Sequence, residues 1–394
     1  MSGEQQAPLS GLSVLANASG VAATYAARML GTMGAQVLLV EATAGSPLRL
    51  EPPFLGREDG SESGVSALFA YLTAGMDTEA IDLTAKAGRE RLLDRLANAD
   101  IFIDDTPLGE REKLGIDEPS VAERFPALVH VSVLPFGASG PKAGWKGEDV
   151  VVQHAGGEGN LLPNGLAVEM FPDRAPLKIA GHFGEMQGGV AAALGALAAI
   201  WARDETGGQY VDISSQDANL AVGAFAIQRL GDGSIEHRAE RSFRYGGVVP
   251  CTDGYLELLT LEQRQWDGLI ELLGRPQWAL DPALADSLER SRRGPEINAH
   301  IRAWAASRNV DDIVAAGQDL GVPLARYMTA GEILVDPQAR HRRLFEPVAI
   351  GDVGTLPVLV SPFHFDAAPL ALGRGPPALD HGPRVAPAAT DAQT

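Results

Sequence analysis

The residues best suited to chemistry gather around position 185. Glu185 stands at the start of an Ala- and Gly-rich segment that we expect to be a helix over 186–202, and His182 precedes it by three residues. A carboxylate can act as a covalent nucleophile, and both side chains can transfer protons. The plainer alternative is that Glu185 stabilises the dipole of the expected helix from solvent and that His182 has no role.

A second acidic pair, Glu148 and Asp149, follows Gly147. Glu148 could act as a base if burial raised its pKa, although an exposed acid beside Lys146 is the simpler interpretation. Asp149 could cap a helix as easily as act chemically. Four glycines flank Glu185, at positions 181, 184, 188 and 189. They could admit a substrate closely, or they could serve only tight helix packing.

Familiar cofactor motifs do not occur. The turn at 16–22 holds one glycine, Gly20, whereas a dinucleotide fingerprint needs three spaced glycines. The sequence has no P-loop, no His-Glu-x-x-His, no paired cysteines and no Gly-x-Ser-x-Gly elbow. We therefore expect no metal and no permanently bound cofactor.

Composition narrows the class of protein. The formal net charge of −19 and the absence of Lys/Arg runs argue against nucleic acid as a partner. Cys251 is the only cysteine, so no intrachain disulfide can form. The N-terminus lacks the features of a signal peptide, and the longest apolar stretch, 188–201, is too short to span a bilayer comfortably. We expect a cytoplasmic protein that does not bind a membrane.

Strands and helices alternate in the first half, which predicts a parallel sheet with helices on its faces. The expected strands cover 12–15, 36–40, 101–103, 128–133 and 209–213. The expected helices cover 22–33 and 87–97, with Arg28 as an exposed helical residue. From about residue 231 the pattern changes to a strand at 255–259 and helices at 264–273 and 298–306, which predicts a smaller second domain. The fold class is therefore α/β.

Motifs along nearly the whole chain resemble those of the family III CoA-transferases, the carnitine and formyl-CoA transferase group. They are LSGLSVL (9–15), GAQVLLVE (34–41), AIDL (80–83), ADIFIDD (99–105), KLG (113–115), PFGASGP (135–141), GEDV (147–150), GGQYVDIS (207–214), DGY (253–255), GVP (321–323) and DP (336–337). The resemblance implies a Rossmann-like large domain over 1–217, a linker at 218–234, a smaller α+β domain over 235–328 and a return to the large domain over 329–394. It also implies an interlocked homodimer, with a heteromer of paralogues as the alternative.

The same resemblance implies a catalytic residue. The segment AGHFGEMQGG (180–189) matches the stretch in which the family carries a catalytic aspartate, and Glu185 stands in the place of that aspartate. In the family, the carboxylate attacks an acyl-CoA thioester, becomes a CoA thioester itself and passes CoA to a small carboxylic acid. A sister branch, the α-methylacyl-CoA racemases, uses a histidine where this chain has Glu148, next to Asp149. Racemase, isomerase or lyase chemistry with Glu185, Glu148 and His182 is therefore the alternative.

The resemblance also points to residues that contact coenzyme A. The candidates are Tyr25, Arg49, Asp105, Thr106, Lys113, Gly137 and Lys142. Several positions that are basic in the family are not basic here: Thr73–Thr78 replaces its NRNKRS segment, and Ala42 replaces a frequent cation. A subunit without catalysis that pairs with an active paralogue is thus a third hypothesis. Gly246 and Gly247 match the family's mobile glycine-rich loop, with a simple turn into a strand as the alternative.

Overall fold

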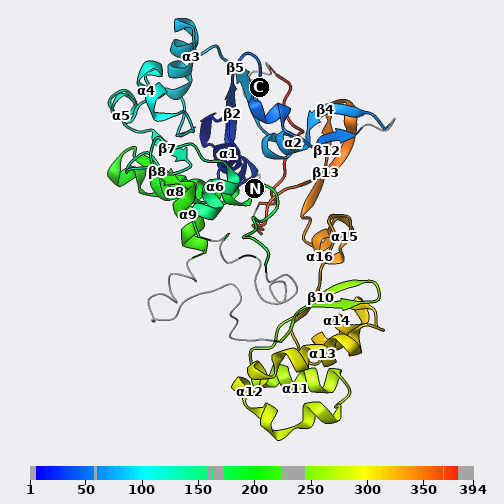
Figure 1. Cartoon of the computed structure of the whole chain (residues 1–394). Coiled ribbons are helices and arrows are strands. Elements are labelled where there is room, and N and C mark those ends of the chain that lie inside the picture. Colours follow the sequence, from blue (N-terminus) through cyan, green and yellow to red (C-terminus); the bar gives the residue numbers. More distant parts are fainter. Residues whose placement is uncertain are drawn as a thin grey trace. The chain divides into compact units, whose positions relative to one another are not determined.

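The computed structural model describes residues 6–56, 60–157, 159, 162, 173–223, 245–366 and 368–379. The chain divides into two compact units (Figure 1). The described residues of the first unit lie within 6–159, 178–223 and 337–379, and those of the second lie at 162, 173–177 and 245–336. The domain boundaries expected from the sequence stay a prediction, because 224–244 lie outside the described residues.

The first unit is built on a parallel sheet. Its order among the described residues is β5 (Asp77–Ala80), β2 (Gln36–Glu41), β1 (Ser13–Asn17), β6 (Ile101–Asp104), β7 (Val129–Leu134) and β8 (Tyr210–Ser214). All neighbouring pairs in it are parallel. Strands β6 and β7 are buried along their full length, as expected when helices cover both faces of a sheet. The predicted α/β class and its strands are confirmed.

The strand order reverses between β1 and β6. From β1 the chain builds outward through β2 to β5, then crosses to β6 and continues through β7 to β8. At such a reversal the loops after the two central strands diverge and leave a crevice at the carboxyl ends. The turn at Ser19 follows β1 and Asp105 follows β6, so both lie at this edge.

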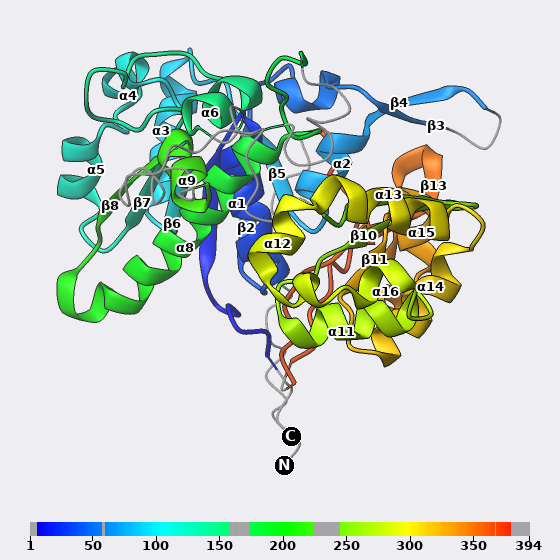
Figure 2. The ribbon, with the colours of Figure 1, turned by 60° about the horizontal axis from the view of Figure 1, so that its bottom comes forward.

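Helices cover the two faces of the sheet. On one face α1 (Val21–Thr32) packs against α8 (Phe183–Thr206), and α6 (Asp149–Ala155) and α9 (Ser215–Val222) also contact α8 (Figure 2). On the other face α3 (Lys86–Leu96), α4 (Leu108–Leu114) and α5 (Glu118–Arg124) surround a second apolar cluster. The predicted helices at 22–33, 87–97 and 186–202 are confirmed.

The glycines of α8 allow close packing. A Cβ at Gly188 would lie 2.2 Å from the Ser215 hydroxyl oxygen, and one at Gly189 would lie 2.6 Å from the Ala22 carbonyl oxygen. A side chain at either position would force the neighbouring helix away. This supports the packing interpretation of those two glycines.

Arg28 was expected to be exposed, and that prediction is wrong. Its exposed fraction is 2%. The guanidinium donates hydrogen bonds to the carbonyl oxygens of Tyr71 and Leu359 and lies 4.2 Å from the centre of the Tyr71 ring. The fork of donors thus joins α1 to the C-terminal part of the first unit, a role that helical periodicity does not reveal.

The first unit also contains elements that lie outside the parallel sheet and the helices on its two faces. They are the 3-10 helix η1 (Pro47–Leu50), the hairpin β3 (Phe54–Gly56) and β4 (Glu62–Ser66), α2 (Ala67–Thr73), α16 (Pro337–His341), and β12 (Phe345–Ile350) paired through η5 (Gly351–Val353) with β13 (Gly354–Leu359). Residues 345–360 share an apolar cluster with α2. The C-terminal segment therefore belongs to the same unit as the parallel sheet.

The second unit has a mixed α+β core. An antiparallel sheet of β9 (Gly247–Cys251), β10 (Gly254–Leu258) and β11 (Leu324–Arg326) packs around Trp266. The helical elements are α11 (Gln263–Leu272), η3 (Gln277–Leu280), η4 (Pro282–Ala285), α12 (Ser287–Arg292), α13 (Gly294–Ala305), α14 (Val310–Asp319) and α15 (Ala330–Val335). The predicted strand at 255–259 and helices at 264–273 and 298–306 are confirmed.

One described helix, α8, has the length and apolar composition of a membrane span. Its small residues Gly184, Gly188, Ala192 and Ala196 are buried against neighbouring elements of the first unit. A core helix of a globular domain meets the same criteria, so α8 is no convincing span.

Candidate active site

Glu185 lies in the first turn of α8, where the helix dipole favours a negative charge. The exposed fraction of its side chain is 21%, and one carboxylate oxygen lies 2.9 Å from Nδ1 of His182. The structure thus brings together the two residues that the sequence placed three positions apart. His182 can orient the carboxylate and, when protonated, stabilise its charge.

Asp149 supports Glu185 from a neighbouring helix. The backbone N–H of Glu185 donates to Oδ1 of Asp149 at 3.2 Å, and Lys178 donates to Oδ2 at 2.7 Å. Asp149 is buried, so Lys178 offsets a carboxylate that has lost most of its water. Asp149 therefore holds the start of α8, which is the capping interpretation of this residue. The sequence did not predict a role for Lys178, because this residue lies in a loop and contacts Asp149 only in the folded chain.

Burial raises the pKa of the Glu185 carboxyl above its ordinary value. The hydrogen bond and charge of His182 act in the opposite direction, and the nearby carboxylates of Asp149 and Glu148 raise the pKa further. Glu148 itself is exposed and its side chain does not cap α6. A partly buried carboxylate with a raised pKa in a cavity is a frequent feature of functional sites.

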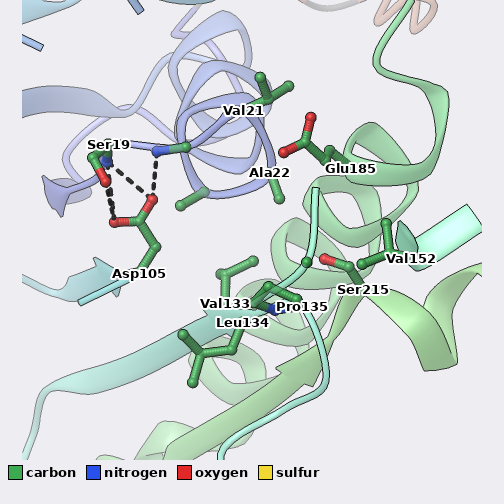
Figure 3. A pocket seen from close by; sticks show the side chains of 13 residues that line it. Ser19, Val21, Ala22, Asp105, Val133, Leu134, Pro135, Val152, Glu185 and Ser215 are labelled. Atoms are coloured by element: carbon green, nitrogen blue, oxygen red, sulfur yellow. Dashed lines mark hydrogen bonds between the residues drawn. The ribbon is translucent and has the colours of Figure 1, made fainter. Parts of the chain in front are cut away.

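A cavity of about 170 Å³ opens beside Glu185 (Figure 3). Its lining residues are Ser19, Gly20, Val21, Ala22, Ala23, Asp105, Val133, Leu134, Pro135, Gly147, Val152, Glu185 and Ser215. We name it the Glu185 pocket. It lies where the loops after β1, β6 and β7 meet the start of α8, so the strand order and α8 together create it.

Asp105 stands at the opposite end of this pocket from Glu185 (Figure 3). Its carboxylate accepts hydrogen bonds from the backbone N–H groups of Ser19, at 2.9 Å, and Gly20, at 2.6 Å, and from the Ser19 hydroxyl at 3.3 Å. Burial nevertheless raises the pKa of Asp105 to about 6, with a further contribution from Asp104. Asp105 therefore ties the end of β6 to the start of α1.

A larger cavity, of about 490 Å³, lies on the other side of Asp105. It shares Ser19 and Asp105 with the Glu185 pocket and also includes Asn17, Glu41, Thr43, Thr84 and Thr106. We name it the outer pocket. Thr106 lines it directly, and its hydroxyl donates to Asp104 at 2.6 Å while accepting from Asn17 at 2.8 Å. Neither pocket is lined by Lys or Arg among the described residues.

The basic residues chosen from the sequence lie elsewhere. Arg49 forms a two-point ion pair with the buried Glu41, with both contacts at 2.7 Å. Lys113 is exposed on α4, and Lys142 lies 5.5 Å from the ring centres of Phe136 and Trp145. The structure does not bring these three residues together around either pocket.

The other candidates have identifiable structural settings. Tyr25 stacks on Tyr71, and burial raises its pKa to about 12. Gly137 turns the chain after β7 with φ of +79°, and the following N–H of Ala138 donates to Asp212 at 2.7 Å. Gly246 and Gly247 are buried in the second unit, where Gly246 N–H donates to Asn298 at 2.8 Å and Gly247 begins β9. That geometry is a turn into a strand, and the role of a mobile loop stays a prediction.

Metal ligands do not cluster in the part of the chain that the structure describes: no group of three or more His, Cys, Asp or Glu residues could hold a metal ion. The arrangement instead offers a partly buried carboxylate, a neighbouring histidine and a cavity with both polar and apolar lining. This combination suits covalent or acid/base chemistry on a substrate that enters from the crevice.

Comparison with known proteins identifies the class. The sequence matches the model of CoA-transferase family III over residues 9–382. A crystal structure of a CaiB/BaiF family protein from Brucella suis superposes with a TM-score of 0.83 and 27% identity, covering 95% of this chain and 97% of that one. The chain therefore belongs to CoA-transferase family III.

Two relatives are named as CoA-transferases. A probable CoA-transferase of Mycobacterium tuberculosis is 31% identical over 324 residues, which cover 78% of this chain and only 38% of that longer protein. The BbsE subunit of succinyl-CoA:(R)-benzylsuccinate CoA-transferase of Thauera aromatica is 27% identical over 90% of this chain and 88% of that subunit. The family match and these relatives together support an enzyme with CoA-transferase activity.

Proposed function

We propose that the protein transfers coenzyme A between an acyl-CoA and a carboxylic acid through a covalent intermediate on Glu185. The observation that carries this proposal is the position of the Glu185 carboxylate, which lines a cavity at the start of α8 and is oriented by His182 at 2.9 Å. A carboxylate that is partly desolvated and fixed in place is a competent nucleophile. Asp149 and Lys178 keep the start of the helix in position.

The reaction divides into four steps. A Glu185 oxygen attacks the thioester carbon of the donor, the C–S bond breaks, and CoA leaves as a thiolate, which gives a mixed anhydride of Glu185 and the donor acid. The thiolate then attacks the Glu185 carbonyl carbon and releases the donor acid as a carboxylate. The acceptor carboxylate attacks the glutamyl-CoA thioester and displaces the thiolate again. Attack of the thiolate on the acceptor's carbonyl carbon in the second anhydride forms the new acyl-CoA and restores Glu185.

Coenzyme A would reach Glu185 from the outer pocket. The two pockets meet at Ser19 and Asp105, which fits a pantetheine arm that passes this point with its thioester directed at Glu185. Thr43 lines the outer pocket and can offer a hydroxyl donor to the nucleotide end, whereas the hydroxyls of Thr84 and Thr106 already donate to Asp82 and Asp104. This placement relies on neutral donors, because Arg49 is engaged with Glu41.

Intact-mass spectrometry under turnover tests the proposal. Incubation with an acyl-CoA should add the mass of CoA less one water, and hydroxylamine should remove the adduct. Glu185→Gln should abolish both the adduct and transfer. Glu205→Gln is the matched control, because Glu205 is an exposed glutamate near the other end of α8. An active enzyme that never carries an adduct, or an active Glu185→Gln variant, contradicts the proposal.

The contact of Glu185 with His182 also supports a second candidate, proton transfer at the α-carbon of an acyl-CoA. The raised pKa of Glu185 makes its carboxyl a stronger base than an ordinary glutamate, which favours proton transfer. Incubation of an acyl-CoA in heavy water without an acceptor acid distinguishes the two. Uptake of deuterium at the α-position supports acid/base chemistry, whereas its absence together with a CoA adduct supports transfer.

The third hypothesis, a subunit without catalysis, is tested by calorimetry. Micromolar binding of CoA by the isolated protein argues against it. Failure to bind CoA, restored by a purified paralogue, would support it.

A further inference from the structure

A buried ion pair lies behind the wall that the two pockets share. Asp104, the last residue of β6, is fully buried, and the exposed fraction of the Arg111 side chain on α4 is 3%. Nε of Arg111 lies 3.1 Å from Oδ2 of Asp104. Neither residue lines the Glu185 pocket or the outer pocket, so neither touches a substrate there. The proposed reaction leaves this ion pair without a role.

Asp104 holds the residues of the shared wall. Its Oδ1 accepts hydrogen bonds from the backbone N–H of Thr106 at 3.1 Å, from the Thr106 hydroxyl at 2.6 Å and from the side-chain amide of Asn17 at 3.3 Å. Asn17 and Thr106 line the outer pocket, and Asp105, which follows Asp104, lines both pockets. The carboxylate of Asp104 therefore fixes the turn that separates the two pockets.

Arg111 holds the same turn from α4. Its Nε donates to the carbonyl oxygen of Thr106 at 2.8 Å, and its Nη1 donates to the Tyr210 hydroxyl at 3.1 Å. The guanidinium thus joins the turn after β6 to α4 and to β8. A planar fork of donors can serve several acceptors at once, which an apolar side chain of similar length cannot do.

Arg111 also compensates the buried charge of Asp104. A carboxylate that has lost its water needs a paired charge, and removal of the partner leaves an uncompensated charge in the interior. His130 lies beside Asp104 as well, but its Nε2 is 3.8 Å from Oδ2 and has no hydrogen-bond partner among the described residues. Without Arg111, the Asp104 carboxylate would turn toward water or take up a proton, and Thr106 would lose its present position.

We propose that Arg111 is a positioning residue for the binding of coenzyme A: acting through Asp104 and Thr106, it keeps the wall between the two pockets in the shape that admits the pantetheine arm. This inference rests on the proposed function, in which that arm passes Asp105 to reach Glu185. Because Arg111 lies behind the wall and away from the reacting carboxylate, its loss weakens substrate and transition-state binding equally. Such a loss raises KM and leaves kcat unchanged.

Arg111→Met tests this role, because methionine keeps much of the length of the side chain and removes its charge and its donors. The KM for the donor acyl-CoA should rise about tenfold while kcat stays within about twofold of the wild-type value. Arg290→Met is the matched control. Arg290 is 3% exposed in the second unit, where it donates to the carbonyl oxygens of Leu284 and Ala285. This control should lose stability as well, but its KM should not change.

Two outcomes of this comparison contradict the inference. A folded Arg111→Met enzyme with the wild-type KM shows that Arg111 does not position the wall. A similar rise of KM in Arg111→Met and Arg290→Met shows a general effect of destabilisation and overturns the specific role.

Arg111→Lys tests the contribution of the charge. Lysine restores a positive charge beside Asp104 and offers a donor to Thr106, although it lacks the fork that also reaches Tyr210. Its KM should therefore lie within about threefold of the wild-type value. An Arg111→Lys enzyme as impaired as Arg111→Met overturns the role given to the pairing with Asp104.

A double variant keeps the test decisive where Arg111→Met does not fold. Asp104→Asn combined with Arg111→Met removes both charges, and the loss of a whole buried pair is tolerated better than the loss of one partner. The Thr106 carbonyl still loses its donor, so KM should rise at least about threefold. A folded double variant with the wild-type KM overturns the inference while leaving CoA transfer established. Absence of transfer and of any adduct on Glu185 in the wild type overturns the proposed function, and this inference with it.

Discussion

His182 and Glu185 share one hydrogen bond, and the protonation of this pair controls the proposed nucleophile. Burial raises the pKa of Glu185, and the carboxylates of Asp149 and Glu148 add to that effect, whereas His182 lowers it. Only the ionised carboxylate attacks a thioester. The rate of adduct formation should therefore rise as the pH increases through the pKa of Glu185, and this rise should lie above the usual glutamate range near pH 4.3.

Substitution of His182 tests this pairing. His182→Gln removes the contribution that lowers the pKa of Glu185, so the rising limb of the pH–rate profile should move to higher pH. Single-turnover adduct formation, followed by mass spectrometry across the pH range, measures the position of the limb. His341→Gln, at an exposed histidine far along the chain, is the control. A limb that stays in place or moves to lower pH contradicts the proposed role of His182.

The contact between α8 and α9 should be sensitive to one methyl group. A Cβ at Gly188 would lie 2.2 Å from the Ser215 hydroxyl oxygen. Gly188→Ala should therefore destabilise the protein by about 1–3 kcal/mol through overpacking, despite the better helix propensity of alanine. Denaturant unfolding measures this difference.

Two further variants separate packing from propensity. Gly188→Ala combined with Ser215→Gly removes the obstructing hydroxyl and should recover most of the lost stability. Gly109→Ala in α4 is the control, because nothing lies within 4 Å of a Cβ built there. A Gly188→Ala protein as stable as the wild type shows that α8 and α9 are less tightly packed than the structure indicates.

The elements themselves could be predicted from the sequence, because apolar runs and helical spacing are local signals. β7 is rich in valine, with only His130 and Ser132 polar, and α8 begins within three residues of its predicted start. The pairing of Glu185 with His182 could be predicted as well, since three residues separate them. Lys178 and the burial of Arg28 could not, because their partners lie far away along the chain.

The candidate cations differ from the sequence prediction because the fold gives them other partners. The sequence offers Arg49 and Lys142 as candidate cations for coenzyme A, but a sequence does not show which cations are already paired within the fold. Arg49 is neutralised by Glu41, eight residues earlier, and Lys142 lies over aromatic rings. Asp105 was chosen for contact with coenzyme A, and its second role, filling the start of α1, required the strand order of the sheet.

Exposed apolar side chains on α8 and α9 support the predicted homodimer. Leu194 is 68% exposed, Trp201 91% and Val222 64%. Large exposed apolar groups on neighbouring helices often mark an interface. Sedimentation should therefore give a mass near twice 41.4 kDa at micromolar concentration, and Leu194→Glu with Trp201→Glu should shift the protein toward monomers. A wild-type monomer under these conditions contradicts the prediction.

The overall charge leads to a prediction about coenzyme A binding. The chain carries a formal net charge of −19, and the described lining of both pockets lacks Lys and Arg. A ligand with several phosphate charges is therefore repelled by the molecule as a whole and gains few local ion pairs. Because salt screens repulsion over a Debye length of about 10 Å at 0.1 M, affinity for CoA should increase between about 20 and 200 mM NaCl.

Calorimetric titration at several salt concentrations measures this trend, and dephospho-CoA, which has a lower negative charge, should show a smaller one. Affinity that falls steeply with salt would instead mean that cations bind the phosphates, and the placement of CoA on neutral donors in the outer pocket would then be wrong.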